Sequence, residues 1–204
     1  MRKIGTLLLG MCFVLGACTA QTATTVQTNE HGTQWEWQAG TIVVKTPERP
    51  AGQKSVLGLT LPKMDVVRVG FVGLGMRGPG AVERFTYIPG TQIVALCDYE
   101  QARAERCQKL LEKASLPKAA VYSGATGYEE LCKRDDIDLV YIAADWLHHF
   151  PVAKCALENG KNVAIEVPSA MNLEECWALI NLSETTRKHC MILENCCYDW
   201  FEMN

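Results

Sequence analysis

The sequence predicts an α/β protein built on a doubly wound parallel sheet, followed by the start of a second, α+β domain that is truncated. Three observations indicate this fold. From residue 66 onward, short apolar runs alternate with helix-like segments, the connections between them are short, and the first run ends in a glycine-rich loop. Regular strand–helix alternation with short crossovers is typical of a parallel sheet wrapped by helices on both faces.

The expected elements follow in a regular order. Buried parallel strands form continuous apolar runs, and such runs occur at 66–72, 92–97, 120–123, 137–143, 162–166 and 190–194. Helix-like patterns lie between them, at about 79–87, 100–113, 127–133, 149–158 and 173–188. The segment 149–158 stops at Asn159-Gly160, a common signal for a helix end. We therefore place one domain at residues 65–194.

The first 18 residues are expected to be an export signal. Arg2 and Lys3 precede an apolar stretch that is too short to cross a bilayer comfortably, and small residues stand directly before Cys18. This pattern is typical of a bacterial lipoprotein, in which Cys18 is lipidated; an ordinary cleaved signal peptide is the alternative. We expect the protein to be lipid-anchored to membrane in the bacterial cell envelope.

Composition and charge indicate a globular domain and argue against nucleic acid. The chain is 48% hydrophobic and 21% charged, with a formal net charge of −3. Loss of Arg2 and Lys3 removes two positive charges, which takes −3 to −5. No basic stripe or tail stands out, so we expect no nucleic-acid partner. The oligomeric state is left open, with a homo-oligomer among the alternatives.

Residues 19–64 are expected to form a tether and an N-terminal arm lying over the domain. They are rich in Thr, Gln, Gly and Pro and show little sustained periodicity. The only strand-like piece that we expect there is 41–45.

The cysteine pattern favours buried thiols over disulfides or metal. Ten cysteines occur, and Cys12 and Cys18 fall in the export segment. Most of the others stand among apolar residues, as Cys97 does. No C-x-x-C pair or zinc-like spacing is present, so no metal site is expected. A redox role for the adjacent Cys196 and Cys197 is the alternative.

The strongest motif is the loop Gly73-Leu74-Gly75-Met76-Arg77-Gly78, directly after the first expected strand. In such a loop Gly73 permits a tight turn, Gly75 lets the backbone approach a pyrophosphate, and Gly78 allows close strand–helix packing. The following helix would offer free N–H groups and a positive dipole end to phosphates. We also expect Met76 to pack on the cofactor and Arg77 to contact its phosphates.

An acid stands at the distance that dinucleotide binding requires. Asp98 ends the second expected strand, twenty residues past Gly78. A carboxylate there accepts hydrogen bonds from the ribose hydroxyls of NAD and repels the 2′-phosphate of NADP. Capping of the next helix is a second role that the same residue could fill. Loop and acid together predict a Rossmann-type domain with NAD as its cofactor.

Further polar and aromatic residues follow the later strands. Loops at the carboxyl ends of parallel strands line the ligand crevice, which makes these residues candidates for the site. They are Trp146, Leu147, His148 and His149 after the fourth strand, Glu166 and Val167 after the fifth, and Asn195 and Tyr198 after the sixth. Tyr198 offers a phenol that can donate or relay a proton. The alternative is that these are half-buried loop residues and a simple strand-end acid.

These motifs together resemble the Gfo/Idh/MocA oxidoreductase superfamily and, within it, glycoside hydrolase family 109, the NAD-dependent α-N-acetylgalactosaminidases. The resemblance covers roughly residues 49–204, which corresponds to the N-terminal half of such enzymes. Ordinary dehydrogenases of the superfamily carry Glu-Lys-Pro where this chain has Glu166-Val167-Pro168. Val167 cannot handle the proton of an oxidised hydroxyl, which disfavours a plain dehydrogenase.

The resemblance implies a cofactor site and a reaction. Tyr198 would lie near the reacting sugar as a catalytic residue. Oxidation of the sugar at C3 by NAD⁺ would acidify C2, the aglycone would leave by elimination, water would add at C1, and the hydride would return. NAD-dependent glycosidases are exceptions to the two-carboxylate route. The cofactor positions carry over onto Met76, Arg77, Asp98, Trp146, Leu147, His148, His149, Glu166, Val167 and Asn195.

The resemblance also raises the question of completeness. The family's remaining substrate contacts, including a catalytic histidine, would lie beyond Asn204. We therefore expect residues 195–204 to begin a truncated C-terminal catalytic domain. The expected substrate is a glycan or glycoside. The alternatives are an NAD-dependent sugar or inositol dehydrogenase and an inactive NAD-binding fragment.

Overall fold

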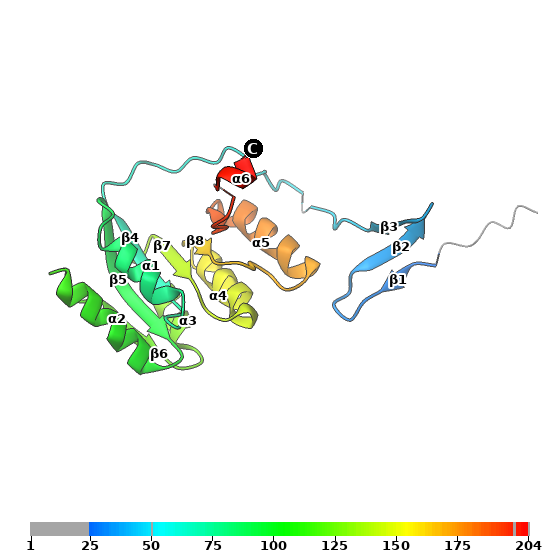
Figure 1. Cartoon of the computed structure of the whole chain (residues 1–204). Coiled ribbons are helices and arrows are strands. Elements are labelled where there is room, and N and C mark those ends of the chain that lie inside the picture. Colours follow the sequence, from blue (N-terminus) through cyan, green and yellow to red (C-terminus); the bar gives the residue numbers. More distant parts are fainter. Residues whose placement is uncertain (1–24, 50, 198, 204) are drawn as a thin grey trace, which may run out of the picture.

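The computed structural model describes residues 25–49, 51–197 and 199–203. Its main body is a six-stranded sheet in the order β6-β5-β4-β7-β8-β9, shown in Figure 1. All neighbouring strands in this sheet run parallel. The strands are β4 (Val67–Val72), β5 (Thr91–Asp98), β6 (Ala120–Ser123), β7 (Leu139–Ile142), β8 (Asn162–Ile165) and β9 (Cys190–Ile192). The predicted doubly wound parallel sheet is confirmed.

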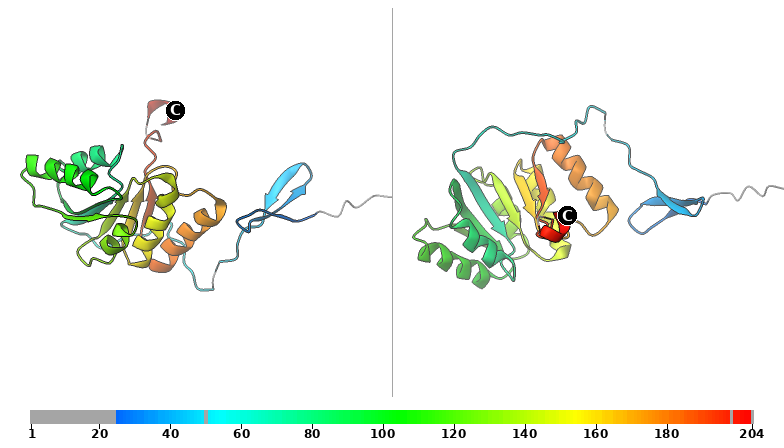
Figure 2. Two further views of the ribbon diagram at one scale, coloured as in Figure 1. Left: turned by 90° about the horizontal axis from the view of Figure 1, so that it is seen from below. Right: turned by 45° about the horizontal axis from the view of Figure 1, so that its top comes forward.

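Helices cover both faces of the sheet, as the views in Figure 2 show. They are α1 (Gly78–Phe85), α2 (Gln101–Lys113), α3 (Gly127–Cys132), α4 (Trp146–Glu158) and α5 (Leu173–Thr186). The short helix α6 (Trp200–Met203) buries no residue and covers neither face. Ala81 of α1 and Leu111 of α2 belong to one buried cluster, whereas Leu131 of α3, Val152 of α4 and Leu179 of α5 belong to the other. Two apolar cores, one on each face, therefore bury the sheet.

The direction of chain progress reverses at β4. The chain proceeds from β4 to β5 and β6 on one side, then crosses over to β7 and continues to β9 on the other. In open α/β sheets the loops on the two sides of such a switch point diverge and leave a crevice at the carboxyl ends of the strands. The glycine loop follows β4, and residues 143–145 follow β7, so both segments border this crevice.

The helix α4 begins three residues earlier than the expected 149. Asp145 precedes Trp146 and its Oδ1 accepts a hydrogen bond from the Leu147 amide at 3.1 Å. An Asp at this position satisfies an otherwise unpaired amide of the first turn, and it fixes where the helix starts. The first turn of α4 therefore lies directly at the crevice.

The N-terminal arm contains more strand than expected. Strands β1 (Gln27–Thr28), β2 (Gln34–Gln38) and β3 (Thr41–Val44) form a three-stranded antiparallel sheet. The expectation that 41–45 is the only strand there was wrong. Ala39 and Gly40 join β2 to β3 with φ of 48° and 82°, the backbone of a two-residue hairpin turn.

The segment between this small sheet and β4 passes the C-terminal end of α5 (Figure 1). Gln53 donates to Asn181 at 2.8 Å and to Glu184 at 2.7 Å. Arg49 pairs with the buried Glu184 at 3.2 Å, and Arg187 donates to two backbone carbonyls of the segment.

Within the described residues, no helix is both long and apolar enough to cross a membrane.

Candidate dinucleotide site

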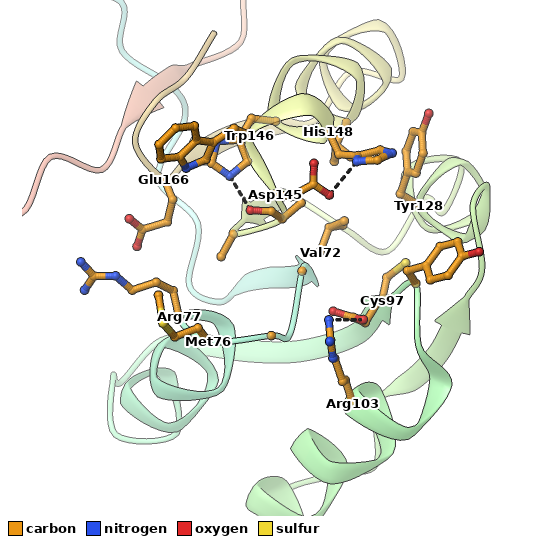
Figure 3. Close-up of a pocket in the computed structure, with 18 of the residues that line it drawn as sticks. Val72, Met76, Arg77, Cys97, Arg103, Tyr128, Asp145, Trp146, His148 and Glu166 are labelled. Atoms are coloured by element: carbon orange, nitrogen blue, oxygen red, sulfur yellow. Dashed lines mark hydrogen bonds and ion pairs between the residues drawn. The ribbon is translucent and has the colours of Figure 1, made fainter. Parts of the chain in front are cut away.

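A cavity of about 520 Å³ lies at the carboxyl ends of the strands, beside the switch point (Figure 3). It is bordered by the glycine loop, the end of β5, the start of α4 and the loop after β8. Most of the predicted cofactor residues line it: Gly73, Gly75, Met76, Arg77, Asp98, Trp146, His148, His149, Glu166, Val167 and Asn195. Gly78 and Leu147 do not line this cavity, and the exposed Leu147 projects elsewhere.

At two positions of the loop, the fold itself requires glycine, because any side chain would clash with backbone atoms. Gly73 has φ of +90°, and a Cβ there would lie 2.2 Å from the backbone nitrogen of Ala144. A Cβ on Gly78 would lie 2.0 Å from the carbonyl oxygen of Gly73. Both distances are impossible contacts with backbone. Gly73 thus lets β4 approach the end of β7, and Gly78 lets α1 start against the loop.

Gly75 is different, because the protein itself leaves room for a side chain there. A Cβ on Gly75 would have Arg103 Nη1 as its nearest neighbour, at an ordinary 3.6 Å. Gly75 lines the cavity, so this open space is part of it. Pro79 has no N–H, so the first turn of α1 offers the amides of Gly78 and Gly80, which have no carbonyl one turn earlier in the helix. Together with the loop they form a cradle that fits a pyrophosphate.

Asp98 is held directly against the glycine loop. It is only 5% exposed, and its Oδ2 accepts from the Leu74 amide at 2.6 Å. Its Oδ1 accepts from the Glu100 amide at 2.9 Å. Glu100 is the residue before α2, and no side chain caps that helix, so Asp98 does not fill the alternative role of a helix cap. A carboxylate oxygen has two acceptor sites, so each oxygen keeps one. The remaining pair suits the two hydroxyls of a ribose.

Two arginines of α2 approach the same loop, and the sequence analysis did not single them out. Arg106 donates to the carbonyl of Leu74 at 3.0 Å, and Arg106 Nη2 lies 3.4 Å from the carbonyl of Gly75. These bonds point the loop carbonyls toward α2 and away from the cavity. Arg103 lines the cavity and lies 3.6 Å from Asp98. Arg103 and Arg106 are three residues apart and therefore lie on one face of α2, which begins just after Asp98. This spacing was the signal in the sequence that could have identified them.

On the opposite wall, Asp145 and His148 form a pair at the start of α4. His148 Nδ1 lies 2.7 Å from Asp145 Oδ2, and both side chains line the cavity in Figure 3. Burial raises the pKa of Asp145, but hydrogen bonds from His148 and the backbone outweigh it and hold that pKa below its usual value. Trp146 stands beside the pair, 61% exposed. His148 and Trp146 were predicted from the sequence, whereas Asp145 was not.

His149 lines the cavity but its ring serves the fold. It is 1% exposed, with Nδ1 2.7 Å from the carbonyl of Pro168 and Nε2 2.9 Å from the carbonyl of Ala144. These contacts tie the end of β7 to the loop after β8. Both loops border the crevice, so His149 positions one against the other.

Glu166 is fixed by a buried tyrosine. Tyr141 donates to Glu166 Oε1 at 3.0 Å and stacks on Phe71 with ring centroids 5.1 Å apart. Burial, together with the Glu166 hydrogen bond, raises the pKa of Tyr141 to about 12. Glu166 therefore faces the cavity from a rigid support. The next residue, Val167, brings an apolar side chain to the same wall.

Some expectations lie outside what the structure describes. Cys18 and Tyr198 fall outside the described residues. Asn195, by contrast, is described and lines the cavity. In the described part of the chain, no group of three or more His, Cys, Asp or Glu side chains is arranged to hold a metal ion. The cavity wall also includes Tyr99 and Tyr128, which the sequence analysis did not select.

The sheet order, the glycine cradle and the acid at its side define a dinucleotide-binding domain. Residues 67–194 match the family described as oxidoreductase family, NAD-binding Rossmann fold. The chain belongs to this family, Gfo/Idh/MocA.

Similar proteins add a more specific relationship. Glycosyl hydrolase family 109 protein 4 of Phocaeicola vulgatus is 80% identical over 205 residues, covering 100% of this chain and 40% of that protein. Glycosyl hydrolase family 109 protein 1 of Bacteroides fragilis is 68% identical over 163 residues, covering 79% of this chain and 35% of that protein. The chain thus spans about 40% of the length of these curated relatives, since glycosyl hydrolase family 109 protein 5 of Phocaeicola vulgatus is covered to 39%.

Among solved structures, myo-inositol dehydrogenase from Lactobacillus casei, in complex with NAD(H) and myo-inositol, is similar at 28% identity with a TM-score of 0.56. The match covers 66% of this chain and 38% of that one. Biliverdin reductase from Synechocystis, in complex with biliverdin and NADP⁺, is 26% identical with a TM-score of 0.53, covering 62% of this chain and 37% of that one.

Proposed function

We propose that this chain is the NAD-binding part of a glycosidase that removes terminal α-N-acetylgalactosamine. The observation that carries the proposal is the cavity itself, which combines a pyrophosphate cradle and Asp98 with the apolar Val167. By the family resemblance, Val167 stands where dehydrogenases carry a lysine. The relatives at 80% and 78% identity, both named glycosyl hydrolase family 109 proteins, support it.

NAD⁺ bound here would supply a temporary hydride acceptor for oxidation of the sugar at C3, which would acidify the neighbouring C2 proton and permit elimination of the aglycone. The chain's own residues hold and orient. The loop 73–78 binds the pyrophosphate, Asp98 the ribose, and the wall formed by Trp146, Glu166 and Asn195 borders the nicotinamide end. Tyr198 is proposed to handle a proton near the sugar, on the resemblance alone.

The experiment follows the C2 proton. The protein that carries this chain is incubated with p-nitrophenyl α-N-acetylgalactosaminide in D₂O, and the released sugar is analysed by NMR and mass spectrometry. Removal and return of the C2 proton predicts deuterium at C2 of the product. A two-carboxylate glycosidase leaves the C2 proton untouched. Hydrolysis without deuterium at C2, or no hydrolysis at all, would contradict the proposal.

A variant of Asp98 tests whether hydrolysis depends on the cofactor, and a variant of Glu105 is its matched control. Asp98→Ala removes the ribose acceptor and is expected to lower hydrolysis at limiting NAD, because binding of NAD weakens. Excess NAD should restore part of the rate if the fold is retained. Glu105→Ala, at an exposed position on the outer side of α2, should leave hydrolysis unchanged.

A second candidate function is favoured by one comparison. The similarity to myo-inositol dehydrogenase raises an NAD-dependent sugar or inositol dehydrogenase as the alternative. Such an enzyme would accumulate NADH with free sugars or inositols, whereas the glycosidase returns the hydride in each turnover. Steady NADH absorbance with free sugar and no release of p-nitrophenol would support the dehydrogenase. NAD binding without either reaction would leave a binding domain only.

We also propose export and lipid anchoring through Cys18. The support is the sequence order of basic residues, apolar stretch and small residues before the cysteine. Labelled palmitate fed to expressing bacteria should enter the wild-type protein and be absent from Cys18→Ala. Equal labelling of both proteins would reject the anchor.

A further inference from the structure

Arg103 is a positively charged side chain that lies between Asp98, the proposed ribose acceptor, and the glycine loop, the proposed pyrophosphate cradle. It reaches from α2 to the end of β5, as Figure 3 shows, and lines the cavity. Its Nη1 lies 3.6 Å from Asp98 Oδ1 and 3.6 Å from the Cβ position of Gly75. The guanidinium is therefore close to both the ribose acceptor and the pyrophosphate cradle.

Two carboxylates share this one guanidinium. Arg103 Nη2 makes a hydrogen-bonding distance of 2.8 Å to Glu100 Oε1, and Nη1 faces the buried Asp98. The side chain of Arg103 is 42% exposed and that of Glu100 is 56% exposed, so this pair can open toward solvent at little cost. The local charge of the three groups is −1, which repels a further anion at the ribose edge.

The presence or absence of a 2′-phosphate distinguishes NADP from NAD, and these three side chains lie where that phosphate would bind. The 2′-phosphate of NADP adds a dianion beside the hydroxyls that Asp98 accepts, and an arginine nearby is the group that accommodates it in domains of this kind. Arg103 lies close enough to Asp98 to contact such a phosphate, but its Nη2 is already paired with Glu100. Bidentate binding of a phosphate uses two N–H groups of the guanidinium, so Nη2 has to be released from Glu100 first.

We propose that Glu100 and Arg103 set the choice between NAD and NADP, with Glu100 holding Arg103 away from a 2′-phosphate. Asp98 rejects the phosphate by charge, and Glu100 keeps the compensating cation engaged. Release of Arg103 from Glu100 gives the site a phosphate ligand. The inference rests on the cofactor assignment made above and goes beyond it to selectivity.

The experiment measures the dissociation constants of NAD and NADP by calorimetry at low ionic strength, where exposed charges are least screened. Glu100→Gln keeps the shape of the side chain and leaves Asp98 intact. We expect it to shift the NADP-to-NAD affinity ratio toward NADP by about threefold to fivefold. Adding Arg103→Ala to Glu100→Gln should abolish the gain, because the phosphate ligand is then missing.

Lys109→Ala in the Glu100→Gln background is the matched control. It removes one positive charge from an exposed position of the same helix, and the NADP gain should persist. Thermal unfolding of each variant without cofactor checks that the domain is folded. A gain that persists after Arg103→Ala, or an unchanged ratio in Glu100→Gln while NAD still binds, would overturn the selectivity inference alone. Binding of neither dinucleotide to the wild-type chain would overturn the cofactor assignment together with it.

Discussion

At the scale of single residues, the loop glycines show how one motif serves two purposes. Gly73 and Gly78 are required by contacts inside the protein, since a Cβ would lie 2.2 Å and 2.0 Å from backbone atoms. A Cβ on Gly75 would make only an ordinary contact with Arg103 Nη1, so the described structure does not itself require glycine there; its role in binding a pyrophosphate is part of the proposal. The motif therefore combines two folding requirements with one proposed binding role.

Gly73→Ala is expected to destabilise the domain by roughly 3 kcal/mol or more, because it adds a backbone clash to a left-handed conformation. Gly124→Ala is the matched control. Gly124 also has a positive φ, of 84°, but a Cβ there meets nothing within 4 Å. Its cost should be about 1 kcal/mol, the conformational part alone. Urea unfolding measures both, and equal losses would contradict the clash.

The sequence allowed some residue roles to be predicted and not others. Gly73, Gly75 and Asp98 follow from a motif whose spacing has a physical reason. Arg103 and Arg106 were missed, because a helical pattern shows that a face is polar without showing which loop it approaches. Asp145 was missed although it directly follows an apolar strand and precedes a helix, the usual context of a helix cap.

At the scale of elements, one ion pair joins the starts of two neighbouring strands. Asp138, just before β7, accepts three bonds from Arg68 of β4: from its amide at 2.8 Å, from Nε at 2.9 Å and from Nη2 at 2.7 Å. The hydrogen bonds from Arg68 hold the pKa of Asp138 below its usual value, although burial opposes them. The pair fixes the register of the two strands that form the switch point.

This pair predicts acid-dependent stability. A carboxyl whose folded-state pKa is depressed stabilises the protein above its unfolded pKa of about 3.9, and this stability is lost as the pH falls through the folded value. Asp138→Asn should cost roughly 2 kcal/mol at neutral pH and flatten the loss of stability on acidification below that unfolded pKa. Asp135→Asn, at an exposed neighbouring position, should do neither. Chemical unfolding at stepped pH measures this, and an unchanged pH profile in Asp138→Asn would contradict it.

Elements with a strong pattern were predicted well, and the weak ones were not. The strand 120–123 and the start of the helix at Leu173 were placed at the residues observed. Strand β2 was missed although Trp35 and Trp37 alternate with polar residues, because the run is only five residues long. Trp35 is partly buried and Trp37 is exposed, so the run has no clearly buried face. Its pairing with β3 is a tertiary interaction that local periodicity does not report.

At the scale of the whole molecule, the cysteines separate into core and surface groups. All eight cysteines within the described residues are free. Cys97, Cys107 and Cys132 are buried, whereas Cys176, Cys196 and Cys197 are exposed. Burial raises the pKa of Cys97 to about 12 and that of Cys190 to about 11, so both stay protonated at mildly alkaline pH. The expected core thiols are present, but the expectation that Cys196 and Cys197 pack in the core was wrong, because both are exposed.

A thiol reagent should therefore distinguish the two groups in the native protein. Cys176, Cys196 and Cys197 should react rapidly with a chromogenic disulfide reagent, because they are exposed, and the buried thiols should react only after unfolding. Cys176→Ser should reduce the rapid phase by one thiol. Rapid labelling of Cys97 or Cys132, identified by mass spectrometry, would contradict the packing of the core.

We infer that the pyrophosphate of NAD lies over Gly75, and the variant Gly75→Ala tests this position. The added methyl meets only Arg103 Nη1 at 3.6 Å, so the unfolding temperature without cofactor should be unchanged. The same methyl lies where the phosphates must approach the backbone, so calorimetry should show NAD affinity reduced by about tenfold or more. An NAD affinity equal to that of the wild-type chain, with the fold intact, would contradict the account.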